Sequence, residues 1–466
     1  MAAKGSAPNY RLARLMTEAG FTSHKAFARA VRKVSEEPQV GRPIGCDHTS
    51  VSRWLQGMKP RGDTALCIAA VLSRALGRQV SLADAGLGSS VSVPPDLGLE
   101  YPLSRADRIE TAARLWRADL EQATAITDRP ANVAAWQYVP LNWLIARPSG
   151  ETLPHREEPQ VGSADVRRLR ATTELFAQLD NQFGGGHARR ALIQYLADDL
   201  ERLLHGRYRD RVGTELLSTA AQATLLAAWM SYDSGLHGLA QRYFIQALGL
   251  AEAGNDRRLA GSVLDAMSHQ ATFLGRFQDA ANLARAARNG AQHIATPSLI
   301  AHYHAMEARA LARLGDTRGC ELALAKAVST FEHRNPESEP GWFQYFDDAE
   351  LAAEFCHCLR DLGRAQAATR YATQSIGSTC GTRSDFFVTM VLADAHLRAG
   401  DAEQACSVAL NALLLGEQLR SAHCASYLRE FQADLPAAGS SAAVRDFQEQ
   451  AAASVLWRQA TEPAGR

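Results

Sequence analysis

Five stretches of the chain repeat one short pattern, and this repetition limits the possible folds more than any other feature. In each stretch a glycine is followed five residues later by a small residue, Ala or Cys. Glycine permits the left-handed turn between two antiparallel helices, and a small residue lets the helices approach closely. The pairs are Gly235 and Ala240, Gly275 and Ala280, Gly315 and Cys320, Gly363 and Ala368, and Gly400 and Ala405. We therefore expect at least five helical hairpins.

Each hairpin alone would leave an apolar face open, so the copies are expected to stack. The glycines are spaced by 40, 40, 48 and 37 residues, which is longer than the tetratricopeptide period of about 34 residues. These copies resemble longer tetratricopeptide variants, and an unrelated all-α bundle is the alternative. Two further helices, at 164–180 and 187–204, are expected to cap or extend the array. The glycines at 184–186 between them could cradle a phosphate, but a turn is favoured because no Walker lysine follows.

Composition divides the 466 residues into several regions. Residues 1–88 read as short helices with polar turns, and residues 89–104 are rich in Gly, Ser and Pro, as in a linker. Residues 105–164 form a connector that begins with a helix, and residues 165–435 carry the repeats. Residues 436–466 are expected to form a final helix, at 441–458, and a tail. The expected fold class is all-α, with a small helix-turn-helix domain before an α-solenoid.

The net charge of zero conceals two regions of opposite sign. Residues 1–88 contain 13 basic and 6 acidic residues, a net charge of +7, and the remainder carries −7. A basic region suits a polyanionic partner, and an acidic one is expected to keep away from it. Residues 1–88, which we call the head, are therefore the part expected to bind nucleic acid.

Five short helices are expected in the head, at 9–19, 23–35, 47–56, 63–77 and 81–87. In the third, Asp47 can cap the first turn, and Val51, Trp54 and Leu55 share one face. A recognition helix needs this arrangement, because one side packs against its domain and the other meets base edges. The candidate DNA-binding residues are His48, Thr49, Ser50, Arg53 and Gln56, with Lys59 and Arg61 as phosphate contacts.

The stretches TSHKAFARAV and HTSVSRWLQGMKP resemble the repressor-type helix-turn-helix of the Xre and lambda-Cro proteins. Ala28 and Val31 match the scaffold helix, and Ser52, Trp54 and Gly57 match the end of the recognition helix. The resemblance implies that the helix at 47–56 enters the major groove of double-stranded DNA. One departure is the segment 32–46, which is longer than the family's turn of about 3 to 4 residues.

The chain as a whole is similar to actinobacterial regulators typified by the Nsd-type negative regulators of Streptomyces development. The segments GGGHARRALIQYL and MSYDSGLHGLAQRYFIQALGLA carry this similarity. It implies transcriptional control of sporulation or antibiotic production. Residues 105–466, which we call the body, would form a homodimer, bind a protein or peptide partner, or do both. The alternative is a protein-interaction scaffold whose head no longer binds DNA.

Other classes of function receive no support from the sequence. It contains no paired catalytic carboxylates, nucleophile elbow or P-loop, so we expect no enzyme, no catalytic residue and no cofactor. The eight cysteines lack C-x-x-C pairs and fit buried free thiols, so no metal site is expected. No segment reaches the roughly 18 apolar residues of a membrane helix, and the expected location is the cytoplasm.

Overall fold

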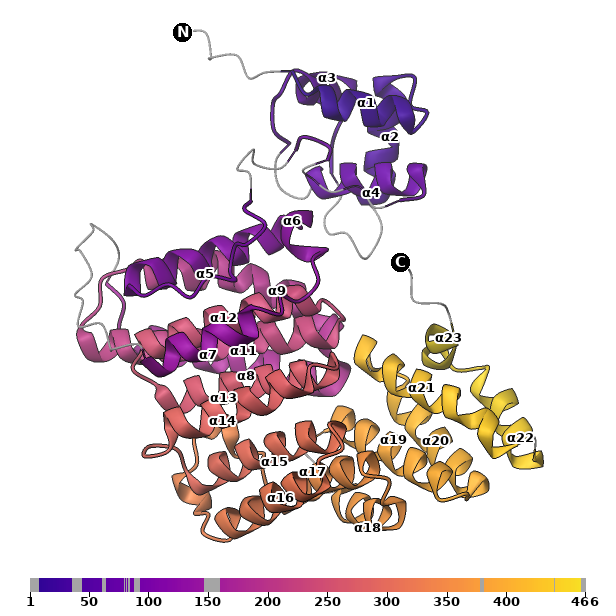
Figure 1. Ribbon diagram of the computed structural model, residues 1–466. Coiled ribbons are helices and arrows are strands. Elements are labelled where there is room, and N and C mark those ends of the chain that lie inside the picture. The colour runs from indigo at the N-terminus through magenta and orange to yellow at the C-terminus, as the bar shows by residue number, and fades with distance from the viewer. Residues whose placement is uncertain are drawn as a thin grey trace. The chain divides into compact units, whose positions relative to one another are not determined.

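The structure of the chain is a computed structural model in which helices make up almost all of the regular structure. It describes residues 8–35, 44–60, 64–78, 80, 82, 84–87, 93–145, 160–377, 381–439 and 441–461. No strand occurs within these ranges, where Gln160 and Arg207 form one isolated bridge. The all-α prediction is therefore confirmed. By its contacts the chain divides into two compact units, residues 1–95 with 117–129 and residues 96–116 with 130–466 (Figure 1).

The first unit contains the predicted head. Its helices are α1 (Tyr10–Glu18), α2 (His24–Ser35), α3 (His48–Leu55), α4 (Thr64–Leu76) and the one-turn α6 (Thr124–Thr127). Leu12, Phe27, Val51, Ile68 and Leu72 are completely buried and form the centre of its core. The four predicted helices between 9 and 77 agree with α1–α4 to within one residue at each end.

The fifth head helix, predicted at 81–87, is wrong. The described residues of this segment form turns: Gly86 has a φ of +63°, and the Leu87 N–H donates to the Leu82 carbonyl. The Asn9 side chain donates to the carbonyls of Ala85 and Gly86, at 2.9 and 3.0 Å. These two carbonyls therefore accept hydrogen bonds from a distant side chain and not from backbone N–H groups of a helix.

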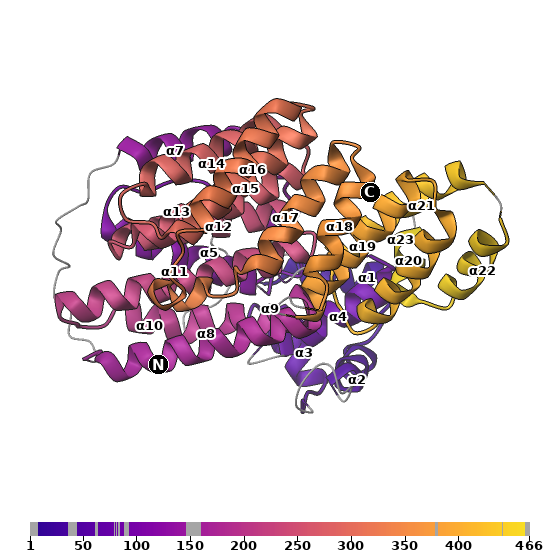
Figure 2. The same cartoon turned by 90° about the horizontal axis from the view of Figure 1, so that it is seen from below.

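The second unit is a stack of helical hairpins, as the repeats predict. Helices α11 to α20 form five hairpins whose members pack along each other, and successive hairpins stack in sequence order (Figure 2). They are α11 (Asp210–Asp233) with α12 (His237–Ala253), α13 (Arg257–Phe273) with α14 (Phe277–Ala291), α15 (Pro297–Arg313) with α16 (Thr317–Phe331), α17 (Asp348–Asp361) with α18 (Ala365–Ser375), and α19 (Thr382–Arg398) with α20 (Ala402–Gly416). The short helices η2 (Pro336–Ser338) and η3 (Gly341–Phe343) lie within the longest repeat spacing.

The turns of all five hairpins have the predicted geometry. The five glycines have φ angles between +73° and +83°. At the first turn the Leu236 N–H donates to the Ser231 carbonyl at 2.9 Å, which satisfies a carbonyl at the end of the helix. The small residues five positions later are completely buried. Local residue types therefore determine the hairpins.

Helices α8 (Ser163–Phe183) and α9 (Gly185–Tyr195) pack against α11 and extend the array, as expected. The second helix continues through the π-turn η1 (Leu196–Leu200) into α10 (Glu201–Leu204). The backbone N–H groups of Gly185 and Gly186, at the turn between α8 and α9, donate to other residues of this chain, which is not the arrangement of a phosphate site. The Gly185 N–H donates to the Asp233 carboxylate at 2.7 Å, and the Gly186 N–H donates to the Arg420 carbonyl at 3.0 Å.

The predicted linker at 89–104 is wrong for its second half, which belongs to the repeat unit. Leu97, Leu99 and Tyr101 are buried, and the Gln246 side chain of α12 donates to the carbonyls of Gly98 and Glu100 at 2.9 and 3.0 Å. A single α12 glutamine thus binds two backbone carbonyls of this segment, which fixes it against the array. Residues 88–92 lie outside the described ranges.

The predicted connector at 105–164 is also not a separate region. Its expected first helix is confirmed as α5 (Arg105–Leu120), which runs from the second unit into the first. The aromatic stretch forms α7 (Ala135–Ile145), which packs against α13 and α14. The fully buried Trp143 of α7 donates to the Glu252 carboxylate at 2.9 Å. This helix is therefore part of the body.

The C-terminal region contains α21 (Ala422–Asp434), η4 (Leu435–Ala438), α22 (Ala442–Ala451) and α23 (Val455–Thr461). The single helix predicted at 441–458 is wrong, because the chain breaks between α22 and α23. Arg458 donates to the carbonyls of Ala452 and Ala453, each at 3.0 Å, and the Ser454 hydroxyl accepts the Trp457 N–H. The rings of Phe447 and Trp457 pack edge to face at 5.1 Å. Both belong to the same hydrophobic core as residues of α19, α20 and α21.

The cysteines of the described ranges are free and buried, as predicted, and Cys380 lies outside those ranges. None of the described helices has the length and apolar character needed to span a bilayer.

Candidate nucleic-acid interface

The helix α3 begins at a well-formed cap. The Asp47 carboxylate accepts the Ser50 N–H at 2.8 Å and the Ser50 hydroxyl at 2.9 Å. Both hydrogen bonds hold the pKa of Asp47 below its ordinary value, and the bond from the Ser50 backbone N–H has the larger effect. The predicted cap is confirmed, and the Ser50 hydroxyl is already engaged at the start of the helix.

The two faces of α3 differ as the sequence predicts. Val51 is completely buried and Trp54 is 6% exposed, and both belong to the core of the head. The side chains of His48, Thr49, Arg53 and Gln56 are exposed, and Ser50 is half-buried. Of these, Thr49 and Arg53 lie opposite the buried side. Lys59 is also exposed just beyond the helix. Arg61 lies outside the described residues, so six of the seven candidate residues can be placed, all on or next to α3.

Three contacts hold α3 in the head. The Asn9 N–H donates to the Leu55 carbonyl at 2.8 Å, which joins the start of α1 to the end of α3. The Cys46 thiol lies 3.5 Å from the Ala28 carbonyl of α2. The Ser35 hydroxyl accepts the Ile44 N–H at 3.0 Å. Ile44, which lies shortly before α3, is therefore held at the last residue of α2. These contacts fix α3 although residues 36–47 separate it from α2.

A cationic stripe on α2 was missed by the sequence reasoning. Lys25, Arg29, Arg32 and Lys33 are all exposed, and at positions i, i+4, i+7 and i+8 they lie on one side of the helix. The opposite side of α2 is buried. The helical spacing of these residues could have revealed the stripe, because apolar residues at 27, 28, 31 and 34 already define the other face. We call these four residues the α2 stripe.

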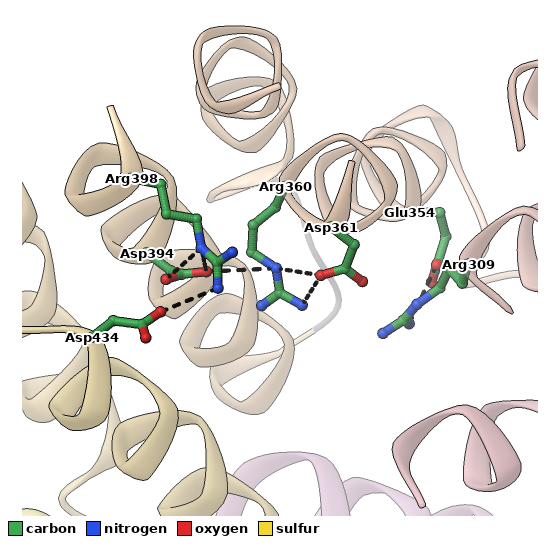
Figure 3. A network of polar contacts seen from close by, with 7 residues as sticks. All are labelled: Arg309, Glu354, Arg360, Asp361, Asp394, Arg398 and Asp434. Carbon is green, nitrogen blue, oxygen red and sulfur yellow. Dashed lines mark hydrogen bonds and ion pairs between the residues drawn. The ribbon is translucent and has the colours of Figure 1, made fainter. Parts of the chain in front are cut away.

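In the second unit, a row of ion pairs, buried at Arg360 and exposed where Arg398 meets Asp434, crosses three helices (Figure 3). Arg360 contacts Asp361 at 2.7 Å and Asp394 at 3.6 Å. Arg398 joins Asp394, at 3.0 Å, to Asp434 of α21, at 3.2 Å. Burial alone would lower the pKa of Arg360, but its carboxylate neighbours outweigh burial and raise it. These pairs connect α17, α19 and α21.

Three histidines of α13, α17 and α21 are buried or half-buried. Burial lowers the pKa of His269, His357 and His423 well below 6.5, and nearby arginines lower it further. The three rings are therefore neutral at pH 7. Within the described part of the chain, no three His, Cys, Asp or Glu side chains are grouped so that they could hold a metal ion.

The SP15 N-terminal domain family matches residues 12–88, which include most of α1 and all of α2, α3 and α4. The match covers less than a fifth of the 466 residues, so it applies to the head alone. No curated protein sequence matches the chain.

Proposed function

We propose that this chain is a DNA-binding transcriptional regulator in which the head contacts DNA and the repeat body senses a partner. The observation that carries the proposal is the exposed polar side of α3, with Arg53 near its end, on a helix whose other side is fixed in a core. In repressor-type heads, the second helix of the pair enters the major groove and the first crosses the phosphate backbone. The α2 stripe supplies positive charge on that first helix.

The roles of the side chains follow from their positions. Arg53 is the best candidate for bidentate contact with guanine, and Thr49 and Gln56 are further candidates for base edges. Lys59 and the α2 stripe suit phosphates, which fix the register of a protein on DNA without reading its sequence. The stacked hairpins offer a surface for a protein or peptide partner and for a second copy of the chain. In a homodimer the two heads would reach half-sites about 34 Å apart.

The proposal includes a cytoplasmic location and a role in development or antibiotic production, for which the resemblance to the Nsd-type regulators is the support. The rival proposal is a scaffold whose head does not bind DNA. The 12 residues between α2 and α3 favour it, because repressor-type proteins have a shorter turn there.

The two proposals differ in how binding to random duplex DNA depends on salt. For the full-length chain we expect the logarithm of affinity to fall linearly with the logarithm of salt concentration, because bound phosphates release counterions. Replacing Lys25 and Arg29 by Gln removes two phosphate contacts and reduces the slope by about 1.8. The matched control replaces Arg167 and Arg170, which are exposed on α8, by Gln. This control should leave the slope unchanged. Fluorescence anisotropy that detects no binding, or equal slopes for both double variants, favours the scaffold.

A further inference from the structure

Helix α8 lies at the start of the repeat array, yet it meets helices from the other end of the array. It packs against α9 and α11, its neighbours along the chain, and also against α19. The Arg420 N–H, shortly before α21, donates to the Phe183 carbonyl at 2.8 Å, and the Gly186 N–H donates to the Arg420 carbonyl at 3.0 Å. The two ends of the array are therefore joined.

An ion pair crosses the same junction. Asp180 of α8 contacts Arg383 of α19, with 2.9 Å between Oδ2 and Nη1. The Arg383 guanidinium also donates to the Asn181 side-chain oxygen at 3.5 Å, across 202 residues of sequence. We call residues 180–186, Arg383 and residues 420–421 the seam.

The Asp180 carboxylate is buried in the seam. The residue is 3% exposed, and its Oδ1 atom has no hydrogen-bond partner among the described residues. Burying an ionised carboxylate is costly unless hydrogen bonds and opposite charges replace its water. Since one oxygen of Asp180 lacks such a partner, the closed seam disfavours the ionised form.

Two charged side chains act on Asp180, and their effects oppose each other. Arg383 favours the carboxylate, whereas Asp233 of α11 adds a second negative charge. The Asp233 carboxylate is held beside the seam, because it accepts the Gly185 N–H and the Ser421 hydroxyl, both at 2.7 Å. Arg383 therefore shares its positive charge between two carboxylates.

The other titratable groups of the elements around the seam are exposed, neutral or bound elsewhere. The exposed ones are His187, Arg190 and Arg420. Arg189 of α9 donates to a serine hydroxyl of α11 at 2.9 Å, and Asp385 of α19 accepts a backbone N–H after α18 at 3.3 Å. At the start of α21, burial lowers the pKa of His423 and raises that of Cys424, so both are neutral. Within the described residues, Arg383 is thus the cation beside Asp180.

The closed seam binds a proton more tightly than an open seam would. Burial and, to a lesser extent, the Asp233 charge raise the pKa of Asp180 from 3.8 to about 6, although Arg383 lowers it. Opening would return the carboxylate to water and its pKa to about 3.8. Because the pKa is higher in the closed form, the proton's contribution to closure is complete below about pH 4 and is lost as the pH rises through 6.

We propose that the seam is a proton-dependent latch, which holds the repeat array closed when Asp180 carries a proton and opens more easily once the carboxylate is ionised. Opening would separate α8 from α19 and break the hydrogen bonds that join Phe183 and Gly186 to Arg420. The inference rests on the proposed function only for its regulatory meaning, because it lets the shape of the partner-sensing body depend on the proton concentration.

Hydrogen exchange of the full-length chain, measured by mass spectrometry without DNA, tests the latch. The reporters are the amides of Gly186 and Arg420, whose hydrogen bonds cross the seam, and peptides of α16 are the reference. Protection factors remove the intrinsic pH dependence of exchange. Between pH 8 and pH 5 the protection of the reporters should rise about tenfold relative to the reference, because Asp180 takes up a proton in the closed form alone. Equal relative protection at the two pH values overturns the proposal.

Variants connect the change in protection to Asp180. Asp180→Asn keeps the size of the side chain but cannot ionise, so the relative protection of the reporters should no longer depend on pH. The matched control Glu174→Gln changes an exposed carboxylate of the same helix and should keep the tenfold change. A tenfold change that persists in a folded Asp180→Asn chain contradicts the latch.

Arg383→Gln is the test if Asp180→Asn fails to fold. It removes the cation that lowers the pKa of Asp180, so protection should begin to rise at a higher pH than in wild type. A rise at the same pH as in wild type contradicts the role of Asp180. Because DNA is absent from these measurements, a failure of the latch and a failure of DNA binding are separate results.

Discussion

Replacing Gly185 by Ala should loosen the closure of the repeat array. A Cβ at this position would lie 2.6 Å from the Met230 carbonyl oxygen and 2.9 Å from the Asp233 Cβ, so one of the helices must move. The movement also strains the 2.7 Å hydrogen bond from the Gly185 N–H to the Asp233 carboxylate. Asp233 in turn accepts the Ser421 hydroxyl at 2.7 Å, directly before α21. The substitution therefore affects both ends of the array.

The expected loss of stability follows from these two contacts. Overpacking costs about 1 to 3 kcal/mol, and a hydrogen bond to a charged group contributes about 1.5 to 3 kcal/mol. Together they lower the free energy of unfolding by about 2.5 to 6 kcal/mol. At about 2.1 cal/mol/K for each of the roughly 360 residues of the body, Tm falls by about 3 to 8 °C.

Differential scanning calorimetry of the full-length chain measures this change. The control is Gly341→Ala, because no atom lies within 4 Å of the added Cβ and the φ angle there is not positive. Gly341→Ala should leave Tm within about 1 °C. Equal Tm values for Gly185→Ala and wild type would refute the close approach of α9 to α11.

Three further predictions concern the head and the buried histidines. Trp54→Ala removes a core ring that is 6% exposed, which costs about 3 to 5 kcal/mol, so the head should unfold and lose DNA binding; a head transition unchanged in the calorimeter would contradict this. Lys59→Ala should weaken binding to all duplexes alike and reduce the salt slope by about one unit, and an effect limited to one sequence would contradict a phosphate contact. The folded chain keeps the pKa of His357 well below the 6.5 of the unfolded chain, so its contribution to stability is present above pH 6.5 and is lost as the pH falls. His357→Gln should therefore reduce the pH dependence of the free energy of unfolding by about 1.4 kcal/mol per pH unit below 6.5, as measured by urea unfolding at pH 7 and 5.5, and an unchanged slope would contradict a buried neutral ring.

The hairpins could be predicted because their signals are local. Gly235 fixes a left-handed turn, and Ala240 five residues later opens a tight helix crossing. The same holds for α3, where Asp47 caps the helix and Trp54 marks its buried side. In each of these cases a few neighbouring residues determine the conformation.

The contacts that close the body could not be predicted in this way. Gly186 donates to Arg420, and Gln246 holds the carbonyl of Gly98, across separations of more than a hundred residues. Nothing in the residues near Gly98 distinguishes a flexible linker from a segment that packs on another helix. For the same reason the hydrogen bond from the Ser421 hydroxyl to the Asp233 carboxylate could not be predicted, since 188 residues separate the two.

The most direct test of DNA recognition is the effect of Arg53→Ala on binding to selected and scrambled duplexes. Selection from random DNA with the full-length chain should yield a preferred sequence, bound at least about 1,000-fold more tightly than scrambled DNA. Arg53→Ala should lose about 1 to 3 kcal/mol on the selected duplex and almost nothing on the scrambled one. The control Arg170→Ala, on the exposed side of α8, should bind both duplexes like wild type. If selection yields no preferred sequence, or if a folded Arg53→Ala chain keeps its full preference, α3 does not read DNA.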